Sequence, residues 1–133
     1  MRYLLDTNVC VDFLNGRYPK VARRLLRLRP DEVAVSSIAV AELRYGAEKS
    51  ARSEENHAQL DLLLEELSPL DFDLESGAAY GALRAALEVR GRPIGPNDML
   101  IAAQALAHGL VLVSADSAEL ERIEGLRLEN WRE

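Results

Sequence analysis

The amino-acid sequence predicts an α/β fold in which a central parallel sheet of about five strands lies between two layers of helices. Two observations lead to this prediction. Short apolar runs alternate along the chain with longer stretches in which apolar residues recur every three or four positions. The helical stretches separate the strand-like runs, so consecutive strands are expected to pair in parallel through right-handed crossovers rather than as hairpins. Such crossovers place helices on both faces of the sheet.

The expected strands are short runs rich in Leu and Val, which is typical of strands that are buried on both faces. They lie at residues 3–5, 33–35, 70–73, 110–113 and 126–128. The third is expected at an edge of the sheet. The Ser68-Pro69 pair just before it is expected to end the preceding helix.

The expected helices fill the segments between these strands, and several have recognisable ends. They lie at residues 9–16, 19–29, 38–49, 54–67, 75–90, 96–108 and 118–123. Thr7 or Asn8 is expected to cap the first helix, and Ser36 or Ser37 the third. Gly109 suits the left-handed conformation that ends many helices, and residues 92–95 are expected to form a loop.

Length and composition predict one globular domain over residues 1–133. A chain of this length can bury a core, and its apolar runs are far too short to cross a membrane. The first residues lack the long apolar core of a signal peptide. A single cysteine, Cys10, cannot form an internal disulfide. We therefore expect a cytoplasmic protein in which Cys10 is a buried small apolar residue.

Four acidic residues are expected at one edge of the sheet. Asp6 closes the first strand, and Asp116 follows the fourth. Asp98 lies in the first turn of the helix over 96–108, and Glu42 lies between one and two turns into the helix after the second strand. Ligands bind beyond the carboxyl ends of parallel strands, so these acids are candidates for a common site. The alternative is that they are helix caps and surface acids, and this alternative is favoured for Asp98 taken alone.

A cluster of carboxylates indicates a bound cation, because neighbouring carboxylates raise one another's pKa unless a positive charge compensates them. Oxygen ligands with few histidines favour Mg²⁺ or Mn²⁺ over Zn²⁺. Mg²⁺ binds few carboxylates together with water and substrate phosphates, so the predicted substrate is a phosphodiester. The predicted reaction is attack on phosphorus by a metal-activated water, with one or two ions.

The net charge of −6 would ordinarily disfavour a nucleic-acid partner, but the charge is unevenly distributed. Residues 1–52 hold ten Lys/Arg and six Asp/Glu, a balance of +4, whereas residues 53–133 hold six and sixteen, a balance of −10. The densest basic segment consists of Arg17, Lys20, Arg23, Arg24, Arg27 and Arg29. These residues, together with Arg44, are candidates to bind RNA phosphates. A solvated helix face is an equal alternative.

Four short motifs, taken together in their order and spacing, resemble the PIN-domain family and specifically its VapC-type toxins. They are LDTN at residues 5–8, AELRYG at 41–46, PIGPND at 93–98 and IAA at 101–103. The resemblance covers nearly the whole chain. It implies a PIN fold, endoribonuclease activity dependent on Mg²⁺ or Mn²⁺, a VapB-like antitoxin as partner, and a homodimer.

The resemblance also ranks the acidic residues. Asp6, Glu42 and Asp98 match the acidic triad of the family. Asp116 matches a fourth position that is Asp or Asn among relatives, so it is expected to contact metal directly or through water. Relatives often have Thr-Asn just before this acid, whereas this chain has Ser114-Ala115, which keeps the hydroxyl and loses the amide.

Three polar residues are expected to support the acids. Thr7 and Asn8 match the positions after the first acid, where a hydroxyl and an amide hold neighbouring carboxylates. Ser114 is a candidate to orient a water or a phosphate. His57 and His108 share no ligand spacing and are expected to be structural or surface residues, and Trp131 to anchor the tail or an interface.

Three rival readings differ from this one at particular residues. A haloacid-dehalogenase-like phosphatase would need a second Asp where this chain has Asn8. A phospho-acceptor receiver domain would need paired acids on the first strand and a Lys after a late strand, where Ser114 stands. A catalytically silent PIN-like module that binds RNA or protein is disfavoured by the intact acids. Which RNA is cut is left open.

Overall fold

The computed structural model describes residues 1–91 and 94–133, and it confirms the α/β prediction. The strands are β1 (Tyr3–Leu5), β2 (Val33–Ser36), β3 (Ser68–Leu70), β4 (Val111–Val113) and β5 (Leu128–Glu129). The α-helices are α1 (Thr7–Asn15), α2 (Pro19–Leu26), α3 (Ser37–Lys49), α4 (Ser53–Glu66), α5 (Leu74–Val89), α6 (Pro96–His108) and α7 (Ser117–Leu120). A short 3₁₀ helix, η1 (Pro30–Glu32), precedes β2.

All five strands pair in parallel in the order β3-β2-β1-β4-β5. The central strand β1 is fully apolar, and it pairs Leu5 with Val35 on one side and with Val113 on the other. The chain moves from β1 toward β3 in its first half and then returns to β4 and β5. The direction of winding therefore reverses between β1 and β4, which is where ligands bind in open parallel sheets.

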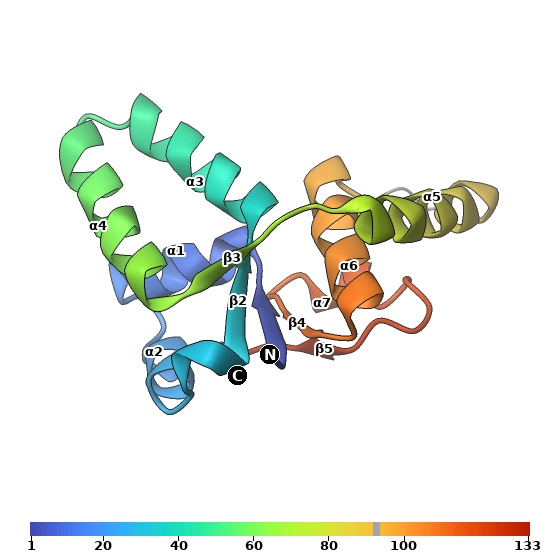
Figure 1. Ribbon diagram of the computed structural model, residues 1–133, viewed down its shortest axis with the longest axis horizontal. Helices are drawn as coiled ribbons and strands as arrows, with labels where there is room; N and C mark the ends of the chain where they lie inside the picture. Colours follow the sequence, from blue (N-terminus) through green and yellow to red (C-terminus); the bar gives the residue numbers. More distant parts are fainter. Residues whose placement is uncertain (92–93) are drawn as a thin grey trace.

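The helices form a layer on each face of the sheet, as predicted. Figure 1 shows α1 to α4 on one side of the strands and α5 to α7 on the other. This division follows from right-handed crossovers, because connections that move in opposite directions along a sheet must cover opposite faces. The fold is thus a three-layer α/β/α arrangement.

The ends of the elements differ from the predictions in instructive ways. Asp6, not Thr7 or Asn8, caps α1, because its backbone is extended and its Oδ1 accepts a hydrogen bond from the Val9 amide at 3.0 Å. Ser36 caps α3 and Gly109 ends α6 with a φ of 64°, as expected. Residues 92–93 of the expected loop lie outside the described residues.

The third strand begins at Ser68 and includes Pro69, so the Ser68-Pro69 pair that was expected to end a helix belongs to a strand. β3 lies at the edge of the sheet, where a proline without an N–H donor is tolerated. The last strand, Leu128–Glu129, lies slightly later than residues 126–128. Both shifts follow from hydrogen bonds to a neighbouring strand, which local apolar patterns do not record.

The tail is anchored to the core, as expected for Trp131. Its indole is 2% exposed and packs edge-to-face on Tyr3, with ring centroids 5.4 Å apart. The next residue, Arg132, donates two hydrogen bonds of 2.6 and 2.9 Å to the buried carboxylate of Asp12 in α1. In the described part of the chain, none of the helices is long and apolar enough to pass through a lipid bilayer.

A buried amide fixes α6 against the sheet. Gln104 is fully buried, and its Nε2 donates to the Leu70 carbonyl oxygen at 2.8 Å. Its Oε1 accepts a hydrogen bond from the Ser36 hydroxyl. Both partners lie at the carboxyl ends of strands, β2 and β3. Because both ends of the amide are satisfied, the bonds hold α6 in place without an unpaired buried polar group.

Candidate active site

The two strands at the reversal point deliver two of the predicted acids. Asp6 follows β1 directly and is 4% exposed, and its backbone amide donates to the Val113 carbonyl oxygen at 3.3 Å. Ser114 and Asp116 follow β4, where the Asp116 amide donates to the Ser114 hydroxyl oxygen at 3.0 Å. Strand pairing therefore places Asp6 beside the turn that carries Asp116.

Glu42 reaches the same region from α3. Its Oε1 accepts a hydrogen bond of 2.5 Å from the hydroxyl of Thr7, in the first turn of α1. The hydroxyl thus holds a neighbouring carboxylate, which is the support proposed for Thr7 on sequence grounds. Asn8, the other residue expected to give such support, is exposed on the first turn of α1.

Asp98 lies in the first turn of α6, and its electrostatic neighbours show which acids face it. Its pKa is raised first by burial and then by the charges of Asp116, Glu119 and Glu42. Glu119 was not predicted. It lies in α7, three residues after Asp116, and its Oε1 accepts a hydrogen bond from the Gly95 amide at the start of α6 at 3.3 Å. The spacing of three residues on a helix could have indicated it.

We call the five acids that converge at the carboxyl ends of β1 and β4 the acidic mouth. They are Asp6, Glu42, Asp98, Asp116 and Glu119. The pKa of Asp6 is raised from 3.8 to about 6, chiefly by burial. Hydrogen bonds from the Ser114 side chain and the Val9 amide offset part of this increase, and the charges of Asp98 and Asp116 have smaller, raising effects. The mouth therefore holds negative charge that its own residues do not neutralise.

This donor set fits a hard divalent cation. Its ligands are carboxylate oxygens, the type that Mg²⁺ and Mn²⁺ prefer. A cation bound there would stabilise the ionised forms of Asp6 and Asp98, whose pKa values are raised by burial and by neighbouring negative charge. Within the described ranges, no three acids of the mouth have ligand atoms within 4.8 Å of one another. That spread suits an ion that keeps several waters between itself and the protein.

A second group of metal-ligand type lies at the other end of α6. The ligand atoms of Asp73, Glu75 and His108 all lie within 4.8 Å of one another. His108 is the last residue of α6, ten residues after Asp98, which corresponds to about 15 Å along a helix. The two groups are therefore separate, and the mouth is the one that lies at the reversal point of the sheet, where β1 and β4 end.

The second group is internally paired. Asp73 caps α5, and its Oδ1 accepts a hydrogen bond from the Ser76 amide at 2.8 Å. Its Oδ2 lies 2.8 Å from Nε2 of His108. The pKa of Asp73 is lowered, first by hydrogen bonds from Ser76 and then by His108. His108, expected to be structural or a surface residue, thus has an acid from another helix as its partner.

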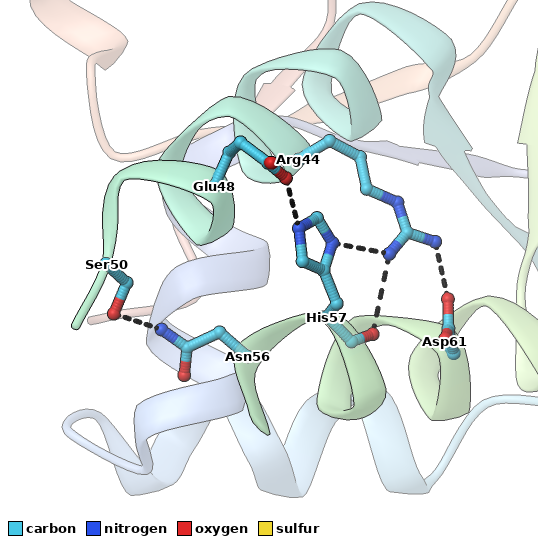
Figure 2. A network of polar contacts seen from close by, with 6 residues as sticks. All are labelled: Arg44, Glu48, Ser50, Asn56, His57 and Asp61. Atoms are coloured by element: carbon cyan, nitrogen blue, oxygen red, sulfur yellow. Dashed lines mark hydrogen bonds and ion pairs between the residues drawn. The ribbon is translucent and has the colours of Figure 1, made fainter. Parts of the chain in front are cut away.

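A polar network next to the mouth joins α3 to α4 (Figure 2). Arg44 donates to Nδ1 of His57 at 3.0 Å and to Asp61 at 2.5 Å. Because a guanidinium has no acceptor, Nδ1 must accept, which leaves the His57 proton on Nε2. Nε2 then donates to Glu48 at 2.9 Å. The network supports the helix that carries Glu42, and it occupies the guanidinium of Arg44.

The remaining basic candidates lie elsewhere. Arg24 pairs with Glu129 at 2.8 Å and stacks on Trp131. The other candidates of this segment are exposed, namely Arg17, Lys20, Arg23, Arg27 and Arg29, and Arg29 pairs with Asp31 at 3.1 Å. Figure 1 shows α2 beside the start of β2, away from the first turns of α3 and α6. RNA binding by these residues stays a prediction.

Cys10 lies beneath the mouth as a buried residue of α1. Its side chain is fully buried, and it is a free thiol. Burial raises the pKa of the Cys10 thiol, and the charge of Asp6 raises it further. A thiol that resists ionisation is a poor nucleophile, which agrees with its expected role as a small apolar core residue.

The sequence matches the PIN domain family over residues 3–126. It is 43% identical over 132 residues to Ribonuclease VapC2 of Rickettsia felis, covering 98% of each chain. It is 37% identical over 131 residues to the tRNA(fMet)-specific endonuclease VapC of Shigella flexneri, again covering 98% of each chain. Among solved structures, VapBC2 of Rickettsia felis bound to a DNA fragment from its promoter is similar, with a TM-score of 0.92, 42% identity, and coverage of 98% of this chain and 99% of that one.

Proposed function

Because the chain belongs to the PIN-domain family and, within it, to the VapC ribonucleases, we propose that it is a Mg²⁺-dependent endoribonuclease, formed by one domain over residues 1–133. The observation that carries this proposal is the acidic mouth, where carboxylates meet at the reversal point of the sheet and where the pKa values of buried Asp6 and half-buried Asp98 are raised. Such a site lacks a positive charge of its own, and a divalent ion with a phosphodiester would complete it.

Each residue of the mouth has a defined part in this proposal. Asp6, Glu42 and Asp98 would hold Mg²⁺, and Asp116 would do so directly or through water. Thr7 and Ser114 orient Glu42 and Asp6 by hydrogen bonds. Bound Mg²⁺, which Mn²⁺ can replace, would lower the pKa of the attacking water and neutralise charge on the leaving oxygen.

The proposed partner is a VapB-like antitoxin, which makes the chain the toxin of a toxin–antitoxin pair. An apolar groove of about 540 Å³ between α1, α2 and α4 offers it a docking surface. Leu26 and Leu62 line this groove and are 76% and 64% exposed, unusually high values for leucines. We expect an apolar segment of the antitoxin to cover them. A homodimer and a cytoplasmic site of action complete the proposal.

The test of the nuclease is cleavage of RNA by the purified chain in Mg²⁺ and in EDTA. The relative in Shigella flexneri makes initiator tRNA the first substrate to try, alongside total RNA. We expect cleavage in Mg²⁺ that EDTA and Asp6→Asn both abolish. The matched control is Asp31→Asn, the same change on an exposed residue of η1. Equal cleavage by wild type and Asp6→Asn would refute the proposal and favour the catalytically silent module.

The partner surface has its own test. Leu26→Arg and Leu62→Arg are expected to weaken inhibition by the antitoxin encoded beside the gene while leaving RNA cleavage intact. Leu74→Arg, which changes a 93% exposed leucine of α5, is the matched control. If all three variants are inhibited equally, the groove is not the docking surface. Light scattering of the free chain measures the proposed dimer.

A further inference from the structure

We propose that a cavity beside Glu42 receives one unpaired base of the RNA, next to the phosphodiester that is cut. This inference rests on the proposed ribonuclease function and adds a binding subsite to it. The cavity lies between α1, α3 and α4 and has a volume of about 480 Å³. Side chains commonly recognise single-stranded RNA by accepting splayed bases into pockets that contact their faces and edges.

The cavity adjoins the acidic mouth through Glu42. Thr7 and Glu42, which are joined by a hydrogen bond of 2.5 Å, both line it. Glu42 thus belongs both to the acidic mouth and to the lining of the cavity. A nucleotide whose phosphate lies at the mouth can therefore extend its base into the cavity without leaving the protein surface.

The lining suits a flat and partly apolar ligand. Val11 and Leu14 from α1, Leu43 from α3 and Leu60 from α4 supply apolar surface. Contact between a base and such surface contributes to binding whatever the base, because every base has a face that can be removed from water. Sites for small organic ligands typically combine apolar walls with polar groups that fix the orientation of the ligand.

Two amides at the rim can read the edge of a base. Asn15 accepts a hydrogen bond from the Arg17 amide at 2.9 Å through Oδ1, which leaves its NH₂ group as a donor. Asn56 donates from Nδ2 to the Ser50 hydroxyl at 2.9 Å, which leaves its carbonyl oxygen as an acceptor (Figure 2). A donor and an acceptor are what the edge of a base requires.

Charge favours a base over a phosphate in this cavity. Among the described residues that line it, two carboxylates, Glu42 and Glu55, stand against one guanidinium, Arg52. A phosphate would be repelled by the excess negative charge, whereas a base is neutral. The phosphate of the same nucleotide belongs at the mouth, where a cation would balance it.

A glycine in the lining allows the cavity to be filled without disturbing the fold. Gly46 lies in α3, and a Cβ added there meets nothing within 4 Å. Gly46→Phe places a ring at the cavity and replaces the poorest helix former short of proline. The matched control is Gly81→Phe, because Gly81 lies in α5 on the other face of the sheet and has equally open surroundings.

The experiment measures binding of a single-stranded ten-nucleotide RNA of mixed sequence and of versions that each lack one base. Both phenylalanine changes are placed in the Asp6→Asn background with Mg²⁺, so that catalysis does not interfere. With Gly81→Phe, removing the base at one position should weaken binding by roughly tenfold or more. Gly46→Phe should bind intact RNA only as tightly as Gly81→Phe binds the version that lacks this base. Removing the same base should not weaken binding to Gly46→Phe any further.

The outcomes separate this inference from the proposed function. Equal losses on base removal in both variants would overturn the subsite, even if the wild type cleaves RNA. If removing the base at one position weakens RNA binding to Gly81→Phe but not to Gly46→Phe, the subsite is supported, even if the wild type fails to cleave RNA. Absence of RNA binding by all variants overturns it. If Gly46→Phe weakens antitoxin binding but not RNA binding, the cavity belongs to the protein partner, and the inference is wrong.

Discussion

The two ends of α6 carry two acidic groups that look alike in composition and differ in electrostatics. At its start, Asp98 belongs to the acidic mouth, where burial and then the charges of neighbouring carboxylates raise its pKa. At its end, His108 lies 2.8 Å from Asp73, whose pKa is lowered by the hydrogen bonds of Ser76 and then by His108. The acidic mouth consists of carboxylates alone, whereas Asp73 has the hydrogen-bond donors of Ser76 and the imidazole of His108 beside it.

The difference shows that closeness of acidic ligands is a poor guide to where an ion acts. The ligand atoms of Asp73, Glu75 and His108 are the closer set, but the negative charge of Asp73 is already stabilised by the donors of Ser76 and by His108. The acids of the mouth lie farther apart and carry an unfavourable free energy that a cation would remove. Variants at the two ends of α6 test this contrast.

The largest effect is expected on catalysis. Asp98→Asn should lower kcat/KM for RNA by about 10³-fold, because a metal site contributes several kcal/mol to charge stabilisation in the transition state. Asp73→Asn should leave it within about twofold. Initial rates of cleavage at saturating Mg²⁺ measure both. A comparable loss in the two variants would move the catalytic ion to the far end of α6 or make both groups necessary.

The second effect concerns pH and the metal-free protein. The pKa of Asp6 is about 6 when folded and near 3.8 when unfolded, so the folded state holds the proton more tightly. The free energy of unfolding should therefore fall as pH rises from 4 to 7, by about 2 kcal/mol. Asp6→Asn should match the wild type near pH 4 and exceed it above pH 7. Urea unfolding in EDTA at several pH values checks this.

Asp73 should show the opposite sign. Its folded pKa lies below the unfolded value, so its stabilising contribution is complete above about pH 4 and is lost as pH falls further. Asp73→Asn should accordingly flatten the acid side of the same stability profile, below about pH 4. An acid side as steep in this variant as in the wild type would contradict the contrast.

The third effect is stabilisation by metal. Mg²⁺ at 100 times its Kd should raise the free energy of unfolding by about 2.7 kcal/mol, because it binds the folded state. Asp98→Asn should lose this gain and His108→Gln should keep it. Thermal unfolding with and without Mg²⁺ provides the measurement. The reverse pattern would identify the Asp73 group as the site of binding.

The smallest effect is expected from His108 itself. Its side chain and that of Asp73 are 27% and 42% exposed, so solvent screens their pairing. His108→Gln should lower the free energy of unfolding by about 0.5–1 kcal/mol and leave RNA cleavage unchanged. Urea unfolding at pH 6 and cleavage rates test the two parts. A large loss of activity would show that the far end of α6 communicates with the mouth.

Features that repeat locally could be predicted from the sequence. Apolar periodicity located each strand and helix to within a few residues, and turn chemistry identified Ser36 and Gly109 as helix ends. The rule for parallel sheets then brought Asp6 and Asp116 to one edge. A local pattern does not reveal that one residue has two roles. The position of Asp6 at the end of the first strand predicts a metal ligand, and it gives no sign that Asp6 also caps α1.

The order of elements, the parallel pairing and the acidic character of the site were thus determined by the sequence itself, because they depend on spacing along the chain. Which distant side chains meet depends instead on the packing of the folded chain. It brought Glu119 to Asp98 and His108 to Asp73, and it joined Arg44 to α4. These contacts depend on how helices pack across the sheet, and that packing sets whether an acid is neutralised by a neighbour or left for a cation.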